Sequence, residues 1–110
     1  MFVAYQSCID ACTKCAAICK QCAASCLGEP QVEHLVVCIR LDLECSAICL
    51  ATAECLTLGS NQANRICQLC ADACLACAAE CEKHAHMEHC IQCAAECHRC
   101  AEECLGMAAA

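Results

Sequence analysis

The sequence predicts an all-α protein, an antiparallel up-down-up-down four-helix bundle with a cysteine-lined core. The main observation is the spacing of its 20 cysteines, which in long runs alternates between steps of three and four residues. That alternation places side chains along one face of an α-helix, whereas a β-strand would need steps of two. The residues between the cysteines are mainly Ala, Glu, Gln, Lys and Leu, and all of these are favourable in a helix interior.

Four groups of cysteines define the four expected helices. The spacing is uninterrupted in the first, third and fourth groups. The second group has fewer cysteines on its inward face. Between Cys38 and Cys45 the spacing calls for another inward residue, and that position is Leu41 or Asp42. Cys55 lies off the line of the other three cysteines. We expect Leu41 to point inward. The four groups are Cys8, Cys12, Cys15, Cys19, Cys22, Cys26; Cys38, Cys45, Cys49, Cys55; Cys67, Cys70, Cys74, Cys77, Cys81; and Cys90, Cys93, Cys97, Cys100, Cys104.

Turn residues separate the expected helices. Gly28-Glu29-Pro30 follows the first group, and Gly59-Ser60-Asn61 follows the second, where Ser60 or Asn61 could cap the third helix. The third break, Lys83 to His86, contains neither Gly nor Pro. Helices of roughly 20 to 25 residues with short connections imply antiparallel neighbours. Their stripes would line a tube about 30 Å long.

The chain is long enough for one domain, which we expect to span all 110 residues, 1–110. Phe2 and Tyr5 are its only aromatic residues, so the cysteines must form much of the core. A small chain so rich in cysteine could be a secreted disulfide scaffold. Residues 1–7 contain no basic region and no apolar run of signal-peptide length. We therefore expect a cytoplasmic protein with reduced thiols.

The charge pattern excludes some classes of partner. The net charge is −7, from 13 acidic and 6 basic residues, and no Lys/Arg cluster could neutralise phosphates, so we expect no nucleic-acid partner. Charged residues interrupt every long apolar stretch, so no membrane span is predicted. An enzyme such as a thiol oxidoreductase is disfavoured, because a redox thiol is exposed and has its own pKa environment, whereas these thiols occupy nearly equivalent buried positions.

The second helix has apolar residues on faces beyond its cysteine stripe, which predicts burial on two sides. We interpret these residues as an oligomer interface, although they could instead widen the contact with neighbouring helices. They are Leu35, Val36, Val37, Ile39, Leu43, Ile48 and Leu50.

Stripes of thiols favour soft metal ions. A buried cysteine can simply pack as a small apolar residue, but Ala, Val or Leu would fill the same space without the risk of oxidation. Thiols three or four residues apart on a helix lie roughly 5 to 6 Å apart at Cβ, so two of them can bind one ion. All-thiolate sites select Cu(I), Zn(II) or iron–sulfur clusters.

Geometry and charge favour Cu(I) among these metals. Zn(II) takes a compact tetrahedral site, and iron–sulfur proteins use a few cysteines in loops, whereas each CxxC here, such as Cys67 to Cys70, belongs to a helical register. Zinc bound by four thiolates also leaves excess negative charge in the core, while about one Cu(I) per thiolate leaves the core near neutrality. The sequence therefore predicts many Cu(I) ions on its cysteines. A metallothionein-like zinc or general heavy-metal buffer remains the alternative.

From Cys8 to Cys104, these stripes resemble the bacterial cytosolic copper storage proteins, a family of cysteine-lined four-helix bundles. The resemblance implies Cu(I) bound mainly by pairs of thiolates inside a preformed bundle. It also implies assembly of bundles into a homotetramer. The expected role is copper storage or detoxification rather than catalysis, and a copper donor or acceptor protein is a possible partner.

Histidines gather at the end of the bundle where the first and third turns meet. Imidazole and thioether bind Cu(I) with little or no deprotonation near neutral pH, so we expect copper to enter here, with His86 and His89 as further metal ligands. If the fourth helix begins by residue 86, His86 continues the stripe through Cys90 and Cys93, and His89 lies on its flank. The alternative is that these are ordinary exposed residues. The group comprises His34, His84, His86, Met87 and His89, whereas His98 is expected to face solvent or an interface.

Overall fold

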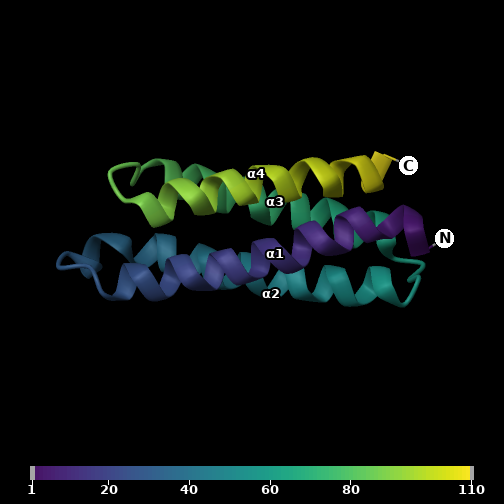
Figure 1. Cartoon of the computed structure of the whole chain (residues 1–110), viewed down its shortest axis with the longest axis horizontal. Helices are drawn as coiled ribbons and strands as arrows, with labels where there is room; N and C mark the ends of the chain where they lie inside the picture. Colours follow the sequence, from purple (N-terminus) through teal and green to yellow (C-terminus); the bar gives the residue numbers. More distant parts are fainter. Residues whose placement is uncertain (1, 110) are drawn as a thin grey trace.

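A computed structural model describes residues 2–109, which form a four-helix bundle. The long helices are α1 (Phe2–Leu27), α2 (Val36–Thr57), α3 (Ala63–Glu82) and α4 (Glu88–Ala109), and a short 3-10 helix, η1 (Val32–Leu35), precedes α2. The molecule is a rod of 47 × 18 × 18 Å. The start of α1 and the end of α4 lie at the same end of this rod (Figure 1).

Each long helix packs against two others. α1 contacts α2 and α4, and α3 contacts the same two helices. Successive helices run antiparallel (Figure 1), as short connections require. The predicted fold class is therefore confirmed. None of the described helices combines the length and the apolar character needed to cross a membrane.

The turn between α2 and α3 has the glycine chemistry that the sequence predicts. Gly59 has a φ of 68°, in the left-handed region where glycine avoids the clash of a Cβ atom. The N–H of Gln62 donates to Oγ of Ser60 at 2.9 Å. This hydrogen bond lies within the turn, and the N-cap of α3 is Gln62, which makes no side-chain cap hydrogen bond. The expectation that Ser60 or Asn61 caps the third helix is therefore wrong.

Thiols fill the interior of the bundle. Every cysteine is buried except Cys55, which is half-buried. Small buried residues such as Ala71 and Ala78 pack among the thiols, and they allow the helices to approach closely. The largest fully buried side chain is Leu56. The core is thus built mainly from sulfur and methyl groups rather than from large apolar side chains.

Helix α2 presents a carboxyl group where its cysteine stripe is interrupted. The expectation that Leu41 points inward is wrong: Leu41 is half-buried, whereas Asp42 is fully buried. The helical register explains the difference, because Asp42 lies four residues after Cys38 and three before Cys45. The inward positions of α2 are Cys38, Asp42, Cys45, Cys49, Thr52 and Leu56.

The apolar residues of the α2 region divide into two sets. One set packs inward, with Leu35 of η1 buried and Ile39 and Ile48 half-buried against the core. The other set remains exposed on the bundle surface, although its members are large and apolar. The exposed residues are Val36, Val37, Leu43 and Leu50.

Candidate metal centre

Sulfur atoms from facing helices form a ladder along the bundle axis. Cys8 lies 3.7 Å from Cys104 near the termini, and Cys38 lies 3.8 Å from Cys81 at the other end. Neighbouring Sγ atoms along the ladder are 3.7–3.9 Å apart. A metal–thiolate bond is about 2.3 Å long, so one ion between two such sulfurs could bind both.

The thiols gather into quartets whose Sγ atoms all lie within 4.8 Å of one another. Neighbouring quartets share members, because Cys15, Cys19, Cys97 and Cys100 each belong to two of them. An ion bound in one quartet would therefore share a sulfur ligand with an ion in the next. Four of these quartets are Cys12, Cys70, Cys100, Cys104; Cys15, Cys49, Cys74, Cys100; Cys15, Cys19, Cys45, Cys97; and Cys19, Cys77, Cys93, Cys97.

Asp42 lies in the interior of the bundle, beside the thiols of Cys77 and Cys93. Its Oδ1 atom accepts hydrogen bonds from Cys77 at 3.1 Å, from Cys93 at 3.3 Å and from Cys81 at 3.8 Å. Its Oδ2 atom is buried and has no hydrogen-bond partner among the described residues. Burial raises the pKa of Asp42 to about 10. The carboxyl group is therefore protonated at neutral pH in the metal-free protein.

Sequence reasoning missed Asp42 because it weighed hydrophobicity above register. An aspartate normally avoids the core unless its oxygens find hydrogen-bond donors. Here the donors are thiols from α3 and α4, which the pattern within α2 does not reveal. The detectable signal was the step of four and then three from Cys38 through Asp42 to Cys45.

Two thiols near the histidines, Cys26 and Cys90, also resist ionisation. Burial raises the pKa of the Cys26 thiol, and it raises the pKa of Cys90 to about 11. Metal ions bind the thiolate rather than the thiol. Binding of metal at this end must therefore displace protons, which the solvent or nearby groups take up.

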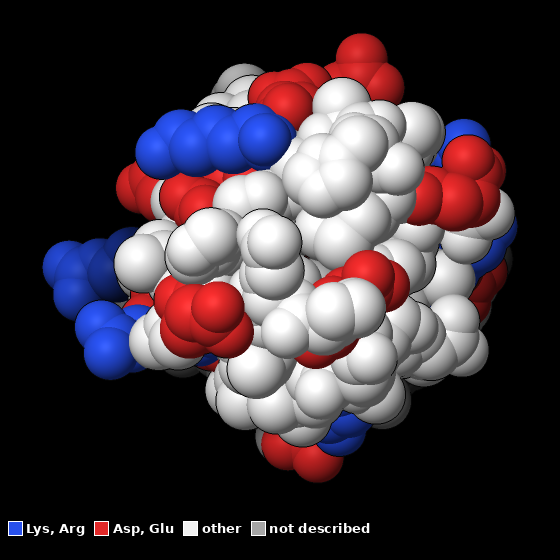
Figure 2. Space-filling model, turned by 90° about the vertical axis from the view of Figure 1, so that its left-hand side faces the viewer, with Lys and Arg blue, Asp and Glu red and all other residues white. Residues whose placement is uncertain are grey.

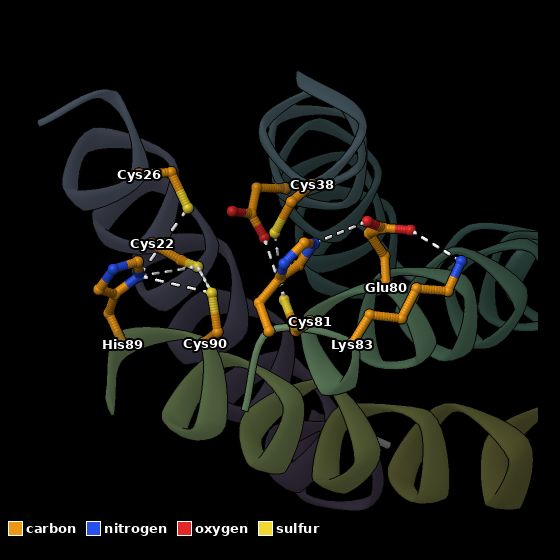
Figure 3. Close-up of polar contacts among 10 residues, drawn as sticks. Cys22, Cys26, Cys38, Glu80, Cys81, Lys83, His89 and Cys90 are labelled. Carbon is orange, nitrogen blue, oxygen red and sulfur yellow. Dashed lines mark hydrogen bonds and ion pairs between the residues drawn. The ribbon is translucent and has the colours of Figure 1, made fainter. Parts of the chain in front are cut away.

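His89 completes a metal-binding group at this end of the bundle. It lies in the first turn of α4 and is half-buried. Its Nδ1 atom is 3.6 Å from the sulfurs of Cys22 and Cys90 and 3.9 Å from that of Cys26. Figure 3 shows the His89 ring beside these three thiols. The four ligand atoms lie within 4.8 Å of one another, so an imidazole nitrogen and three sulfurs could bind one ion.

His86 lies farther out than expected. Helix α4 begins at Glu88, so His86 does not continue the cysteine stripe but lies in the preceding loop, where it is exposed. Its ring centroid is 6.4 Å from that of His84. The loop Lys83 to Met87 closes through its own backbone hydrogen bonds, including Met87 N–H to His84 O at 3.0 Å. Because this loop forms a turn of its own, α4 begins two residues later than the expectation for His86 assumes.

A hollow of about 380 Å³ opens between the two loops at this end. His34, His84 and His86 line it together with the buried Met87. Figure 2 shows this end of the bundle face on. Acidic side chains are scattered there among residues of other types, which are drawn in white. The predicted gathering of histidines at one end of the bundle is thus observed.

Two sequence-predicted residues lie away from the ladder. Cys55 is half-buried, while its neighbour Leu56 takes the inward position. His98 is exposed, and its Nε2 atom lies 3.1 Å from Oε2 of Glu82. This agrees with the expectation that His98 points away from the thiols.

The fold and the ladder define a class of protein, a four-helix bundle whose interior offers overlapping thiolate sites for several soft metal ions. Over residues 2–109 the chain matches the copper storage protein family, and it belongs to that family. It is also similar to individual members of known sequence or structure.

A cytosolic copper storage protein from Streptomyces lividans, solved with five coppers, is 40% identical to this chain. The two structures superpose with a TM-score of 0.95 over 99% of this chain and 95% of the other. The Cu(I)-bound copper storage protein BsCsp3 is 44% identical, with a TM-score of 0.91 over 96% of this chain and 98% of the other. An uncharacterized cysteine-rich protein from Bacillus subtilis is 46% identical over 104 residues, 94% of this chain and 95% of its own length.

Proposed function

We propose that this chain stores Cu(I) in the cytosol, on thiolates along the inside of the bundle. The sharing of sulfurs between neighbouring quartets carries the proposal. Independent four-coordinate Zn(II) sites would compete for the shared sulfurs, whereas low-coordinate Cu(I) ions can use them as bridges. The Cu(I)-bound relative and the copper-loaded cytosolic relative support this choice of metal and compartment.

Charge in the core supports the same metal. The buried polar or charged side chains of the described residues are Asp42, Ser46 and Thr52, none of which is cationic. Thiolates formed on metal binding must therefore be neutralised by the metal itself, because unpaired buried charge is costly. About one monovalent Cu(I) per thiolate leaves the core near neutrality. Bound ions serve as stored cargo, and we assign no catalytic role to the chain.

Asp42 supplements the thiols. Its unpaired Oδ2 atom faces no donor among the described residues, and the thiols that donate to Oδ1 lose their protons when they bind metal. A carboxylate at this level could then contribute an oxygen ligand where α2 lacks a sulfur. We therefore include Asp42 among the residues that hold the metal.

Copper is taken up at the histidine end. There His89 contacts the thiols of Cys22 and Cys90 directly. His86 and Met87 line the hollow at the same end. The opposite end has an apolar closure, in which Leu56 is fully buried and Tyr5 and Met107 pack against the core. Imidazole needs no deprotonation near neutral pH, so His89 can receive an ion before a buried thiol has lost its proton.

The bundles associate into a homotetramer through the exposed apolar face of α2. Val36, Val37 and Leu43 are each about half exposed, at 52%, which is unusual for large apolar residues on one helix of a monomer. Burial of such a face in a contact between copies would remove it from water.

The test is an anaerobic titration of the reduced protein with Cu(I) and, separately, with Zn(II). We expect saturation on the order of 20 Cu(I) per chain but only about 5 Zn(II). Cys15→Ser removes a sulfur of two quartets and should lower the Cu(I) capacity by about one or two ions. Cys55→Ser, at a half-buried position outside the ladder, is the matched control and should leave the capacity nearly unchanged. Saturation with Cu(I) at the zinc value would contradict the ladder of bridged ions.

A further inference from the structure

The imidazole of His89 lies between two unlike partners. Three sulfurs face its Nδ1 atom, at 3.6–3.9 Å. On the opposite edge of the ring, Nε2 lies 3.4 Å from Oε2 of Glu29. One edge of the ring is thus directed at the thiol ladder and the other at a carboxylate.

A neutral imidazole carries one N–H group and one nitrogen lone pair, on different ring atoms. An ionised carboxylate can only accept hydrogen bonds, so its contact favours the form in which Nε2 carries the proton. The lone pair then belongs to Nδ1, which faces Cys22, Cys26 and Cys90. A hydrogen bond on one ring nitrogen generally determines which nitrogen binds a metal and raises the basicity of that ligand.

We propose that Glu29 is a positioning residue, which holds His89 in the orientation and tautomer that direct the Nδ1 lone pair at an incoming Cu(I). This inference rests on the proposed uptake of copper at the histidine end. Glu29 itself does not contact the metal in this arrangement. It acts through His89 and so affects the speed of the first uptake rather than the capacity of the store.

The local fold places Glu29 where this role requires it. Its backbone N–H donates to the carbonyl of Cys26 at 3.1 Å, just beyond the end of α1, and Pro30 follows and restricts the chain. The side chains of Glu29 and His89 are only 36% and 22% exposed, so water competes with their contact less than at an open surface. The contact joins the α1–α2 loop to the first turn of α4.

His84 provides an internal comparison. Its Nε2 atom also meets a carboxylate, Oε2 of Glu80, at 3.0 Å, but Lys83 shares that carboxylate at 3.3 Å. No thiol hydrogen bond reaches the ring of His84 within the described part of the chain, whereas three reach that of His89. Among the described histidines, the combination of a carboxylate on one nitrogen and thiols on the other is found at His89.

Two substitutions separate positioning from simple charge attraction. Glu29→Asp keeps the negative charge but shortens the side chain, so the contact with Nε2 is lost. Glu29→Gln removes the charge but keeps an oxygen acceptor at the same reach. Glu33, exposed in η1 at the same end, provides the matched controls Glu33→Asp and Glu33→Gln.

The first readout is the ¹⁵N NMR spectrum of the His89 imidazole in the reduced, metal-free protein. We expect the Nε2-protonated form in the wild type and in Glu29→Gln, and a mixture of tautomers in Glu29→Asp. The second readout is the rate at which the first equivalent of Cu(I) leaves the chelator bicinchoninate for the protein. We expect Glu29→Asp to slow this step roughly tenfold, with Glu29→Gln and both Glu33 variants close to wild type.

The variant His89→Ala separates a failure of the proposed uptake route from a failure of the role assigned to Glu29. If His89→Ala takes up copper at the wild-type rate, copper does not enter through His89 and the proposed uptake route is wrong. If His89→Ala is slow while Glu29→Asp retains both the wild-type tautomer and the wild-type rate, the route stands and the role of Glu29 is wrong. If Glu29→Gln is slow while Glu29→Asp, which keeps the charge, takes up copper at the wild-type rate, charge rather than positioning governs uptake, which also overturns the role assigned to Glu29.

Discussion

Oδ1 of Asp42, on α2, lies 3.1 Å from Sγ of Cys77, on the neighbouring helix α3. The contact places a carboxyl group inside a wall that is otherwise made of thiols. Because burial raises the pKa of Asp42 to about 10, this group is neutral in the metal-free protein at neutral pH. Asp42 therefore adds no charge to the metal-free core.

The first prediction concerns the pH dependence of stability. Folding raises the pKa of Asp42 from 3.8 to about 10, so the folded chain holds a proton that the unfolded chain releases. The stabilisation is complete below about pH 3.8 and declines as the pH rises toward 10. Between about pH 5 and 8, the free energy of unfolding of the wild type should fall relative to Asp42→Asn by up to about 1.4 kcal/mol per pH unit.

Urea denaturation of the reduced, metal-free proteins at several pH values measures this difference. The comparison with Asp42→Asn cancels the contributions of the histidines, which both proteins share. Parallel pH profiles for the two proteins would mean that Asp42 is ionised in the folded state, contrary to its buried position among thiols.

The second prediction is that the reduced, metal-free protein is already helical. The helices consist of good helix formers, and protonated thiols pack as small apolar groups. Far-ultraviolet circular dichroism should show a helical spectrum that changes little when Cu(I) is added. A coil spectrum that becomes helical only with metal would indicate a metallothionein-like mechanism, in which binding drives folding.

Much of this structure was predictable because a single periodic signal determines it. The alternation of three and four residues places thiols inside three of the helices, and the glycine-containing turns mark the ends of α1 and α2. Asp42 was missed because its burial depends on donors from other helices, such as Cys77. A pattern within one helix does not contain that information.

The histidine end was predictable in composition but not in geometry. His89 was expected on the flank of the stripe, and it reaches Cys22 and Cys90. His86 was expected to continue the stripe, but α4 begins at Glu88, two residues later than that expectation assumed, and His86 is left exposed in the loop. The contact between Glu29 and His89 joins residues 60 positions apart. It depends on how two loops approach each other, which local spacing does not specify.

The third prediction concerns assembly. The 11.6 kDa chain should sediment as a tetramer, and Leu43→Glu should dissociate it, because a charge within the apolar face of α2 would lose its hydration on association. Leu75, on α3, is also exposed, at 42%, and Leu75→Glu serves as the matched control that leaves assembly intact. Analytical ultracentrifugation gives the masses. A wild type that stays monomeric, or equal dissociation by both variants, would rule out the α2 interface.

The last prediction is that copper enters from one end. The triple variant His86→Ala, Met87→Ala, His89→Ala removes the donors at the hollow but leaves the ladder of sulfurs. Uptake from a Cu(I) chelator should therefore slow, while the total capacity stays nearly unchanged. The opposite variant, Cys8→Ser, Cys67→Ser, Cys104→Ser, removes sulfurs at the far end, behind the closure formed by Leu56. It should lower the capacity by about three ions, since each sulfur accounts for about one Cu(I), without slowing the first uptake.

Crystals loaded with a few equivalents of copper independently test at which end of the bundle copper enters. The earliest copper should lie among Cys22, Cys26, His89 and Cys90, because these are the thiols that an imidazole nitrogen already touches. Later ions would then occupy the shared quartets beyond. Early copper beside Cys8 and Cys67, combined with a normal uptake rate in the histidine variant, would place the entrance at the end near the termini. In that case the hydrogen-bond geometry of His89 would have to serve the stability of the α4 start rather than the uptake of metal.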